Sequence, residues 1–208
     1  MSKDIAQILL DTQAVFLSVE KPFTWASGIQ SPIYCDNRKV LAFPKERETI
    51  KQAFLNILKE YDYDAIIGTA TAGIPMASIL ADATNKPLGY VRSSKKDHGR
   101  QNQIEGFSKE HSKVIVVEDL ISTGKSVLKV VDALKEAGIE VIAVIAIFSY
   151  NMHLSQEQFS ASGVSYRVLS DFNTLMQLAL EQGMITSQQE KQLKKFQNNP
   201  QNNEWIQA

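Results

Sequence analysis

The sequence predicts an α/β protein whose core is a parallel sheet with helices on both faces. From residue 64 onward, short apolar runs alternate with segments of helical periodicity, as in chains that build such sheets. The most apolar short run, Val114–Val117, lacks polar alternation, which favours a strand buried on both faces. Small-residue turns, 68–73 and 122–126, follow two of the predicted strands. Because parallel strands end at one sheet edge, we expect these turns to lie close together.

The first third of the chain is expected to hold two amphipathic helices separated by an irregular segment. Residues 4–19 and 45–59 both carry apolar residues at helical spacing. Between them, residues 21–40 lack helical periodicity and are rich in turn formers and aromatics. This segment is either a connecting loop or a wall of a binding site.

The alternating part of the chain is expected to end in further helices. Ser155 with Gln158, and Ser187 with Glu190, fit the capping-box pattern of helix starts, and another helix is expected after Asp171. The segment NNPQNNEW near the end is expected to be mobile. We expect a single domain over 1–208, with N-terminal helices and the irregular segment at about 1–60, an α/β core at about 61–170 and C-terminal helices at about 171–208. The predicted strands are 65–67, 88–91, 114–117, 141–148 and 166–169, and helices are predicted through 76–83 and 127–134.

Composition excludes several classes of partner. The chain has 208 residues and a net charge of -1, so no overall field attracts nucleic acid or a membrane surface. The longest apolar run, Val141–Phe148, is far shorter than the ~20 residues of a membrane helix. The first residues, MSKDIAQ, lack the apolar core of a signal peptide. Cys35 is the single cysteine, which excludes an internal disulfide, and a soluble, cytoplasmic protein is expected.

The residue pattern of Val114–Ser126, VIVVEDLISTGKS, indicates a binding site for a particular kind of ligand. Two acids, Glu118 and Asp119, stand where the strand is expected to end, and a hydroxyl-rich turn leads into a helix. Unpaired backbone N–H groups and the helix dipole at such a turn attract phosphate. The adjacent acids suit hydroxyl groups or a divalent cation, so a sugar phosphate fits both halves. The alternative is a core strand whose acids merely mark its exposed end.

A nucleotide-kinase P-loop is excluded by spacing. Gly124-Lys125-Ser126 matches the end of G-x-x-x-x-G-K-S, which requires a glycine five positions before Gly124. The chain has Asp119 there, and its carboxylate would face the anion that the loop should hold.

Two other stretches suggest anion chemistry. The turn 68–73, GTATAG, has side chains small enough for a backbone to approach a ligand closely, although it could simply be a tight turn. Two anion-binding turns at one edge suggest a ligand with two phosphate groups. The polar segment 92–106 is long and basic, so it is either a lid that offsets charge on a leaving group or a solvated surface.

The stretch Val114–Ser126 closely resembles the phosphoribosyl-pyrophosphate (PRPP) motif of the type I phosphoribosyltransferases. In that family the two acids hold the ribose hydroxyls, the turn after them holds the 5′-phosphate, and the counterpart of 68–73 binds pyrophosphate. The pattern R-x-x-x-K-x-H-G from Arg92 and the hood segment 23–38, FTWASGIQSPIYCDNR, narrow the resemblance to the orotate phosphoribosyltransferases. In these the hood covers the flat orotate ring.

The resemblance implies Mg²⁺-dependent transfer of ribose 5-phosphate from PRPP to orotate in pyrimidine (UMP) biosynthesis. It implies Mg²⁺ held mainly by PRPP near Asp119, and a homodimer whose loop 92–106 is shared across subunits. Alternatives are a phosphoribosyltransferase for a purine or uracil, and a PRPP-sensing regulator.

The same resemblance assigns candidate roles to individual residues. It also exposes departures from the family pattern: Lys125 stands where glycine is common, Met76 where histidine is frequent, and Gln30 where lysine is frequent. A Lys125 with positive φ would be strained, whereas otherwise its ammonium could help to bind the 5′-phosphate. The implied catalytic residues are Arg92, Lys96, His98 and Asp119; the PRPP-binding residues are Thr71, Ala72, Arg92, Lys96, His98, Glu118, Asp119, Leu120, Ile121, Ser122, Thr123, Gly124, Lys125 and Ser126; the orotate-binding residues are Phe23, Tyr34 and Ser122.

Overall fold

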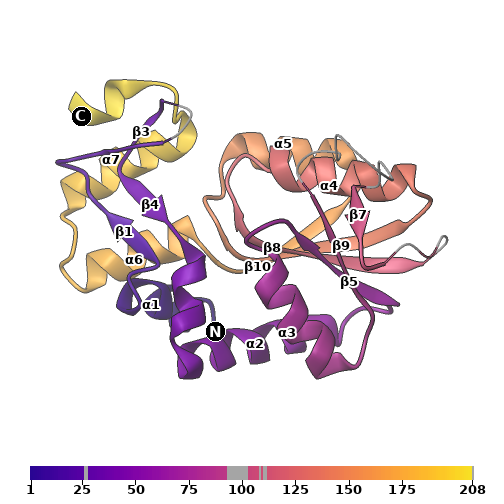
Figure 1. Cartoon of the computed structure of the whole chain (residues 1–208). Coiled ribbons are helices and arrows are strands. Elements are labelled where there is room, and N and C mark those ends of the chain that lie inside the picture. The colour runs from indigo at the N-terminus through magenta and orange to yellow at the C-terminus, as the bar shows by residue number, and fades with distance from the viewer. Residues whose placement is uncertain (26–27, 93–102, 108, 110–111, 208) are drawn as a thin grey trace.

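A six-stranded sheet forms the centre of the protein in the computed structural model, which describes residues 1–25, 28–92, 103–107, 109 and 112–207 (Figure 1). The strand order is β10-β9-β8-β5-β6-β7, and every described pair is parallel except β6 with β7. The predicted parallel sheet is therefore confirmed, with one short antiparallel edge strand. The strands are β5 (Ala65–Thr69), β6 (Leu88–Val91), β7 (Ile104–Glu105), β8 (Lys113–Ile121), β9 (Glu140–Ser149) and β10 (Ser165–Asp171).

Helices cover both faces of this sheet and bury two apolar clusters. In Figure 1, α4 (Lys125–Glu136) and α5 (His153–Ser162) lie on the opposite side of the sheet from α2 (Pro44–Leu58) and α3 (Ile74–Thr84). Successive side chains of a strand point to opposite faces, and accordingly Val116 belongs to one cluster and Val117 to the other. Val116 and Val117, on the two faces of β8, are therefore both excluded from water.

The N-terminal segment forms small antiparallel pairs beside the main sheet. Helix α1 spans Ser2–Asp11, and a 3₁₀-helix, Asn37–Ala42, leads into α2. The predicted helix 4–19 is wrong beyond α1, because Gln13 turns the chain with φ 53° and Val15–Leu17 forms strand β1. Its partner is β4 (Ile33–Cys35), a tertiary contact that local periodicity does not reveal. A second pair joins β2 (Phe23–Thr24) and β3 (Gln30–Ser31).

Two predicted helix starts are also wrong in detail. Helix α5 begins before Ser155, whose hydroxyl donates to the Met152 carbonyl at 2.7 Å instead of capping the helix. Helix α7 (Ser187–Asn198) is capped one residue earlier than predicted, because Thr186 and Gln189 form the capping box. The helix expected after Asp171 is confirmed as α6 (Phe172–Glu181), and the Asp171 carboxylate accepts from Thr174 N at 2.8 Å.

Strand β8 is longer than predicted. It continues to Ile121, so Glu118 and Asp119 lie within the strand and not after its end. The extension is paired on one side only in the described register: β9 pairs as far as Ile121, whereas the β5 pairing ends at Val117. Pairing with β9 outweighs the low strand propensity of the two acids.

The C-terminal segment packs against the hood. Trp205 is 1% exposed and meets Phe196 edge-on with ring centroids 5.7 Å apart. Phe196 in turn contacts Trp25 at 5.8 Å, and Trp25 stacks on Tyr150 at 5.3 Å with an interplanar angle of 15°. The mobility expected for residues 198–205 conflicts with the complete burial of Trp205 near their end, in the 3₁₀-helix Asn203–Gln207. No described helix has both the length and the apolarity to cross a membrane.

Replacing Trp205 by alanine tests this docking. A buried aromatic truncated to alanine leaves a cavity and typically costs about 3–5 kcal/mol of unfolding free energy. We expect Trp205→Ala to lower stability by that amount in denaturant unfolding. Ile206→Ala is the matched control, because its side chain is 41% exposed, and it should change stability little. Equal stability of the two variants would contradict a docked C-terminus.

Candidate active site

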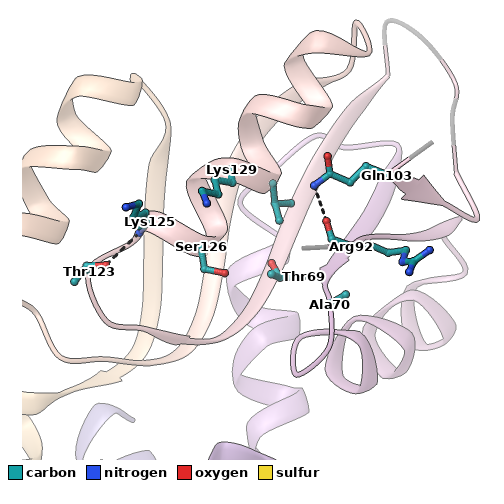
Figure 2. Close-up of a pocket in the computed structure, with 9 residues that line it drawn as sticks. Thr69, Ala70, Arg92, Gln103, Thr123, Lys125, Ser126 and Lys129 are labelled. Carbon is teal, nitrogen blue, oxygen red and sulfur yellow. Dashed lines mark hydrogen bonds between the residues drawn. The ribbon is translucent and has the colours of Figure 1, made fainter. Parts of the chain in front are cut away.

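A cavity of about 350 Å³ opens at the carboxyl edge of the sheet. Strands β5 and β8 are adjacent and parallel, so the turns that follow them meet at this edge, as predicted. In Figure 2, Thr69 at the end of β5 and Arg92 after β6 lie on one side, and Thr123, Lys125 and Ser126 lie on the other, with the Arg92 side chain directed away from α4. The described lining residues are Thr69, Ala70, Arg92, Gln103, Thr123, Lys125, Ser126, Lys129 and Val130.

The turn after β8 is shaped by Gly124. Its φ is +82°, a conformation that side chains rarely adopt, and an added Cβ would lie 3.2 Å from the Phe159 ring. Lys125 is the first residue of α4 and does not share this positive φ, so lysine is not strained there. Thr123, Lys125 and Ser126 surround the helix start with hydroxyl groups and one ammonium. The arrangement suits an anion.

The turn after β5 lies directly on β8. A Cβ added to Gly73 would stand 2.3 Å from the Val117 carbonyl oxygen, so no side chain fits between turn and strand. The Ala70–Thr71 peptide bond in this turn is cis, and Thr71 is exposed. Ala72 lines a small second cavity together with Asp119. The turn after β5 and the turn after β8, which both hold predicted site residues, therefore lie close together at the same edge of the sheet.

The two acids of β8 have different surroundings. Glu118 is only 6% exposed, whereas Asp119 is half-buried. Burial raises the pKa of Glu118 well above its ordinary value, and the neighbouring Asp119 carboxyl raises that pKa further. Glu118 Oε1 accepts from Asp119 N at 2.9 Å. Glu118 is thus a buried carboxyl that favours its protonated form, and Asp119 is the more exposed acid at the sheet edge.

The raised pKa of Glu118 also bears on metal binding. Mg²⁺ prefers ionised carboxylates and other hard oxygen ligands, so this shift disfavours Glu118 as a ligand. In the described part of the chain, no group of three or more His, Cys, Asp or Glu side chains is arranged to hold a metal ion. A cation here would therefore need most of its ligands from a bound substrate.

Arg92 and Gln103 hold together the two ends of the polar segment. Arg92 N donates to Gln103 O at 3.0 Å, and Gln103 Nε2 donates to Arg92 O at 2.6 Å. The Arg92 guanidinium lies 4.0 Å from Glu105. The predicted residues Lys96 and His98, and Ser93 beside Arg92, lie outside the described residues.

Five lining residues are not among the predicted site residues, namely Thr69, Ala70, Gln103, Lys129 and Val130, although Thr69 and Ala70 lie in the predicted turn 68–73. Lys129 stands one helical turn after Lys125, and spacing of four residues could have placed both on one face of α4. Gln103 lies inside the polar segment but carries no charge, so it did not stand out there. Of the other two departures, Met76 is buried in α3 and lines the small cavity beside Asp119, and Gln30 Nε2 donates to Thr24 Oγ1 at 2.9 Å in the β2–β3 pair.

The hood residues proposed for base binding lie in a separate group. Phe23 and Tyr34 contact each other with ring centroids 5.6 Å apart, and Tyr34 is 41% exposed. Neither is among the described residues that line the cavity, whereas Ser122 lies in the turn beside it. The hood approaches the site through Asn37 and Arg38, which line the small cavity beside Asp119.

Comparisons with known proteins agree with this α/β fold and show which family the chain belongs to. Residues 37–177 match the phosphoribosyl transferase domain family. An orotate phosphoribosyltransferase of Bacillus cytotoxicus is 47% identical over 210 residues, covering 100% of both chains. One from Streptococcus pneumoniae is 49% identical over 204 residues, covering 97% of each.

A solved structure agrees with these sequence relatives. The orotate phosphoribosyltransferase of Aeropyrum pernix superposes with a TM-score of 0.76 at 28% identity, covering 88% of this chain and 99% of that one. The chain therefore belongs to the phosphoribosyltransferases and, within them, to the orotate phosphoribosyltransferase family.

The state of Glu118 is testable through the pH dependence of stability. A folded-state pKa above the unfolded value means that the folded protein binds more protons, so stability falls as pH rises from the unfolded pKa toward the folded one. Glu118→Gln mimics the protonated carboxyl and removes this loss. We expect the variant to be more stable than the wild type at pH 8, with the difference shrinking toward pH 5 in thermal unfolding. A constant difference across that range would contradict a raised pKa.

Proposed function

We propose that this protein transfers ribose 5-phosphate from PRPP to N1 of orotate, releasing pyrophosphate and forming orotidine 5′-monophosphate for pyrimidine biosynthesis. The observation that carries the proposal is the placement of two anion-binding turns at the ends of the adjacent strands β5 and β8, with Asp119 beside them. A ligand with a phosphate at each end of a sugar diol fits this arrangement. The two relatives compared above are orotate phosphoribosyltransferases, and their names supply the base.

Each part of the edge has a role in this reaction. The turn 122–126 would hold the 5′-phosphate, with the Lys125 ammonium adding attraction, and the turn 68–73 would hold pyrophosphate. Asp119 would orient the ribose hydroxyls. The Lys129 side chain, on the same cavity, would add positive charge on the phosphate side.

The chemistry requires charge stabilisation and no protein nucleophile. Positive charge develops at the anomeric carbon as pyrophosphate leaves, and the ionised Asp119 tolerates it. Arg92 lines the cavity, and Lys96 and His98 follow it in the chain, so these residues would offset the negative charge of the leaving group. Orotate is already an anion, so a strong protein base is not required.

We further propose Mg²⁺ as the cofactor. The ion would be held mainly by PRPP oxygens near Asp119, in keeping with a site that offers one ionised carboxylate. When bound, it would neutralise charge on the pyrophosphate. Glu118, buried and favouring its neutral form, would position the Asp119 backbone and not the metal.

The location and assembly of the protein are also proposals. The composition, with one cysteine and near-neutral charge, favours the cytoplasm. The motif from Arg92 to Gly99 suggests a homodimer in which loop 92–106 of one subunit serves the site of the other.

An absorbance assay tests the reaction directly. We expect orotate to be consumed when PRPP and Mg²⁺ are both present, and uracil, hypoxanthine and adenine to remain unchanged under the same conditions. Turnover of another base in place of orotate would keep the fold and overturn the assignment of the base. PRPP binding without turnover of any of the four would favour a regulator.

Mixing two inactive variants tests the shared loop. Lys96→Ala removes a loop charge, and Asp119→Ala removes the acid at the sheet edge. If the loop acts across subunits, a mixed dimer contains one site with neither change, and we expect up to about a quarter of wild-type activity from random subunit exchange. No recovery despite exchange demonstrated by mass-tagged subunits would contradict shared sites.

A further inference from the structure

One buried side chain joins the hood to the strand that carries Asp119. Asn37 is 2% exposed and lies where β4 leads into the 3₁₀-helix. Its Nδ2 donates to the Asp119 carbonyl oxygen at 2.6 Å, across 82 residues of sequence. Its Oδ1 accepts from Cys35 Sγ at 3.1 Å. The amide therefore bridges β4 of the hood and β8 of the core.

The position of Asp119 in its strand explains why this bridge matters. The pairing of β8 with β5 ends at Val117 with Gly68, so the Asp119 peptide lies beyond the last described β5 pair. On that side of β8, Asn37 provides a donor in place of a neighbouring strand. Removing the Asn37 amide would leave the part-buried Asp119 carbonyl without this donor, which is costly in a low-dielectric interior.

The Asn37 amide makes both contacts of this bridge, one through each of its ends. An asparagine side chain donates through its nitrogen and accepts through its oxygen, whereas a carboxylate only accepts. The protein around the Cys35 thiol excludes water and raises the pKa of that thiol well above its ordinary value, so the sulfur keeps its proton. The thiol thereby fixes which end of the Asn37 amide faces Asp119.

The neighbours of Cys35 connect the bridge to the proposed base site. Tyr34 precedes Cys35 on β4 and contacts Phe23, and these two aromatics are the candidates for covering orotate. A shift of the hood around its ligand therefore moves Cys35 and Asn37, and the Asp119 peptide moves with the amide that holds it.

We propose that Asn37 is a positioning residue that couples the base-covering hood to Asp119, so that occupation of one substrate site orders the other. The proposal rests on the proposed function, because it concerns the two substrates of that reaction. Asn37 would not touch the reacting atoms. It would act through the Asp119 backbone, whose side chain orients the ribose.

Asn37→Asp is the decisive variant. It keeps the shape of asparagine and the acceptor for Cys35, but once ionised its carboxylate cannot donate to the Asp119 carbonyl. The kinetics are therefore compared at alkaline pH, where burial no longer keeps the carboxyl protonated. We expect kcat to fall at least tenfold. We also expect the KM for orotate to become independent of PRPP concentration, whereas in the wild type it should decrease as PRPP saturates.

Two variants of Cys35 test whether the thiol contributes to the coupling between the two substrate sites. Cys35→Ser keeps a donor for Asn37 Oδ1 and should retain kcat and the dependence of orotate KM on PRPP. Cys35→Ala removes the donor and should give values between those of the wild type and Asn37→Asp.

A matched control separates positioning from general stability. Ser155 is fully buried and its hydroxyl also donates to a backbone carbonyl, that of Met152, in helix α5. Ser155→Ala should lower the melting temperature without changing kcat or the interdependence of the substrates. The coupling proposal is overturned if Asn37→Asp keeps wild-type kinetics, or if its loss of activity equals that of Ser155→Ala at the same loss of stability. Absence of orotate turnover in the wild type would instead overturn the proposed function.

Discussion

The structure depends on the parallel pairing of β5 with β8 and on the close contact that this pairing allows between Gly73 and the Val117 carbonyl. Because nothing larger than hydrogen fits at Gly73, the turn after β5 lies directly against the central strand. The turn after β8 opens at the same edge, where Gly124 directs the backbone into α4. Two groups of backbone donors therefore meet around one space without any side chain having to bridge them.

Adjacent residues of a strand face opposite sides, and this geometry gives the two acids of β8 different chemistry. One faces the interior, where water is excluded, and it favours the neutral form. The other lies beside the open edge and keeps contact with solvent and with the hood. A pair of carboxyls that look equivalent in the sequence therefore divides into a buried group and a more exposed one.

The sequence predicted the sheet, the order of its strands in the chain and the convergence of its two turns, because these follow from local apolar runs and small residues. It failed where tertiary pairing decides: Val15–Leu17 became a strand through β4, and β8 continued past its acids through β9. The resemblance named the acids and the turn 122–126, and Lys129 could have been found from its spacing to Lys125. No local pattern could show that Asn37 contacts Asp119, since 82 residues separate them.

The packing of Trp205 on Phe196 and Trp25 has a consequence for the order in which the protein matures. Lys3 of α1 also pairs with Glu181 at the end of α6, across 178 residues of sequence. Contacts this distant in sequence form late, since the intervening chain must be ordered first. During synthesis the central sheet can assemble while the last helices are still inside the ribosome. The hood, which is proposed to recognise the base, gains its packing against Phe196 and Trp205 only after the sheet has formed. The wall around the base is therefore expected to be the last part of the proposed site to become ordered.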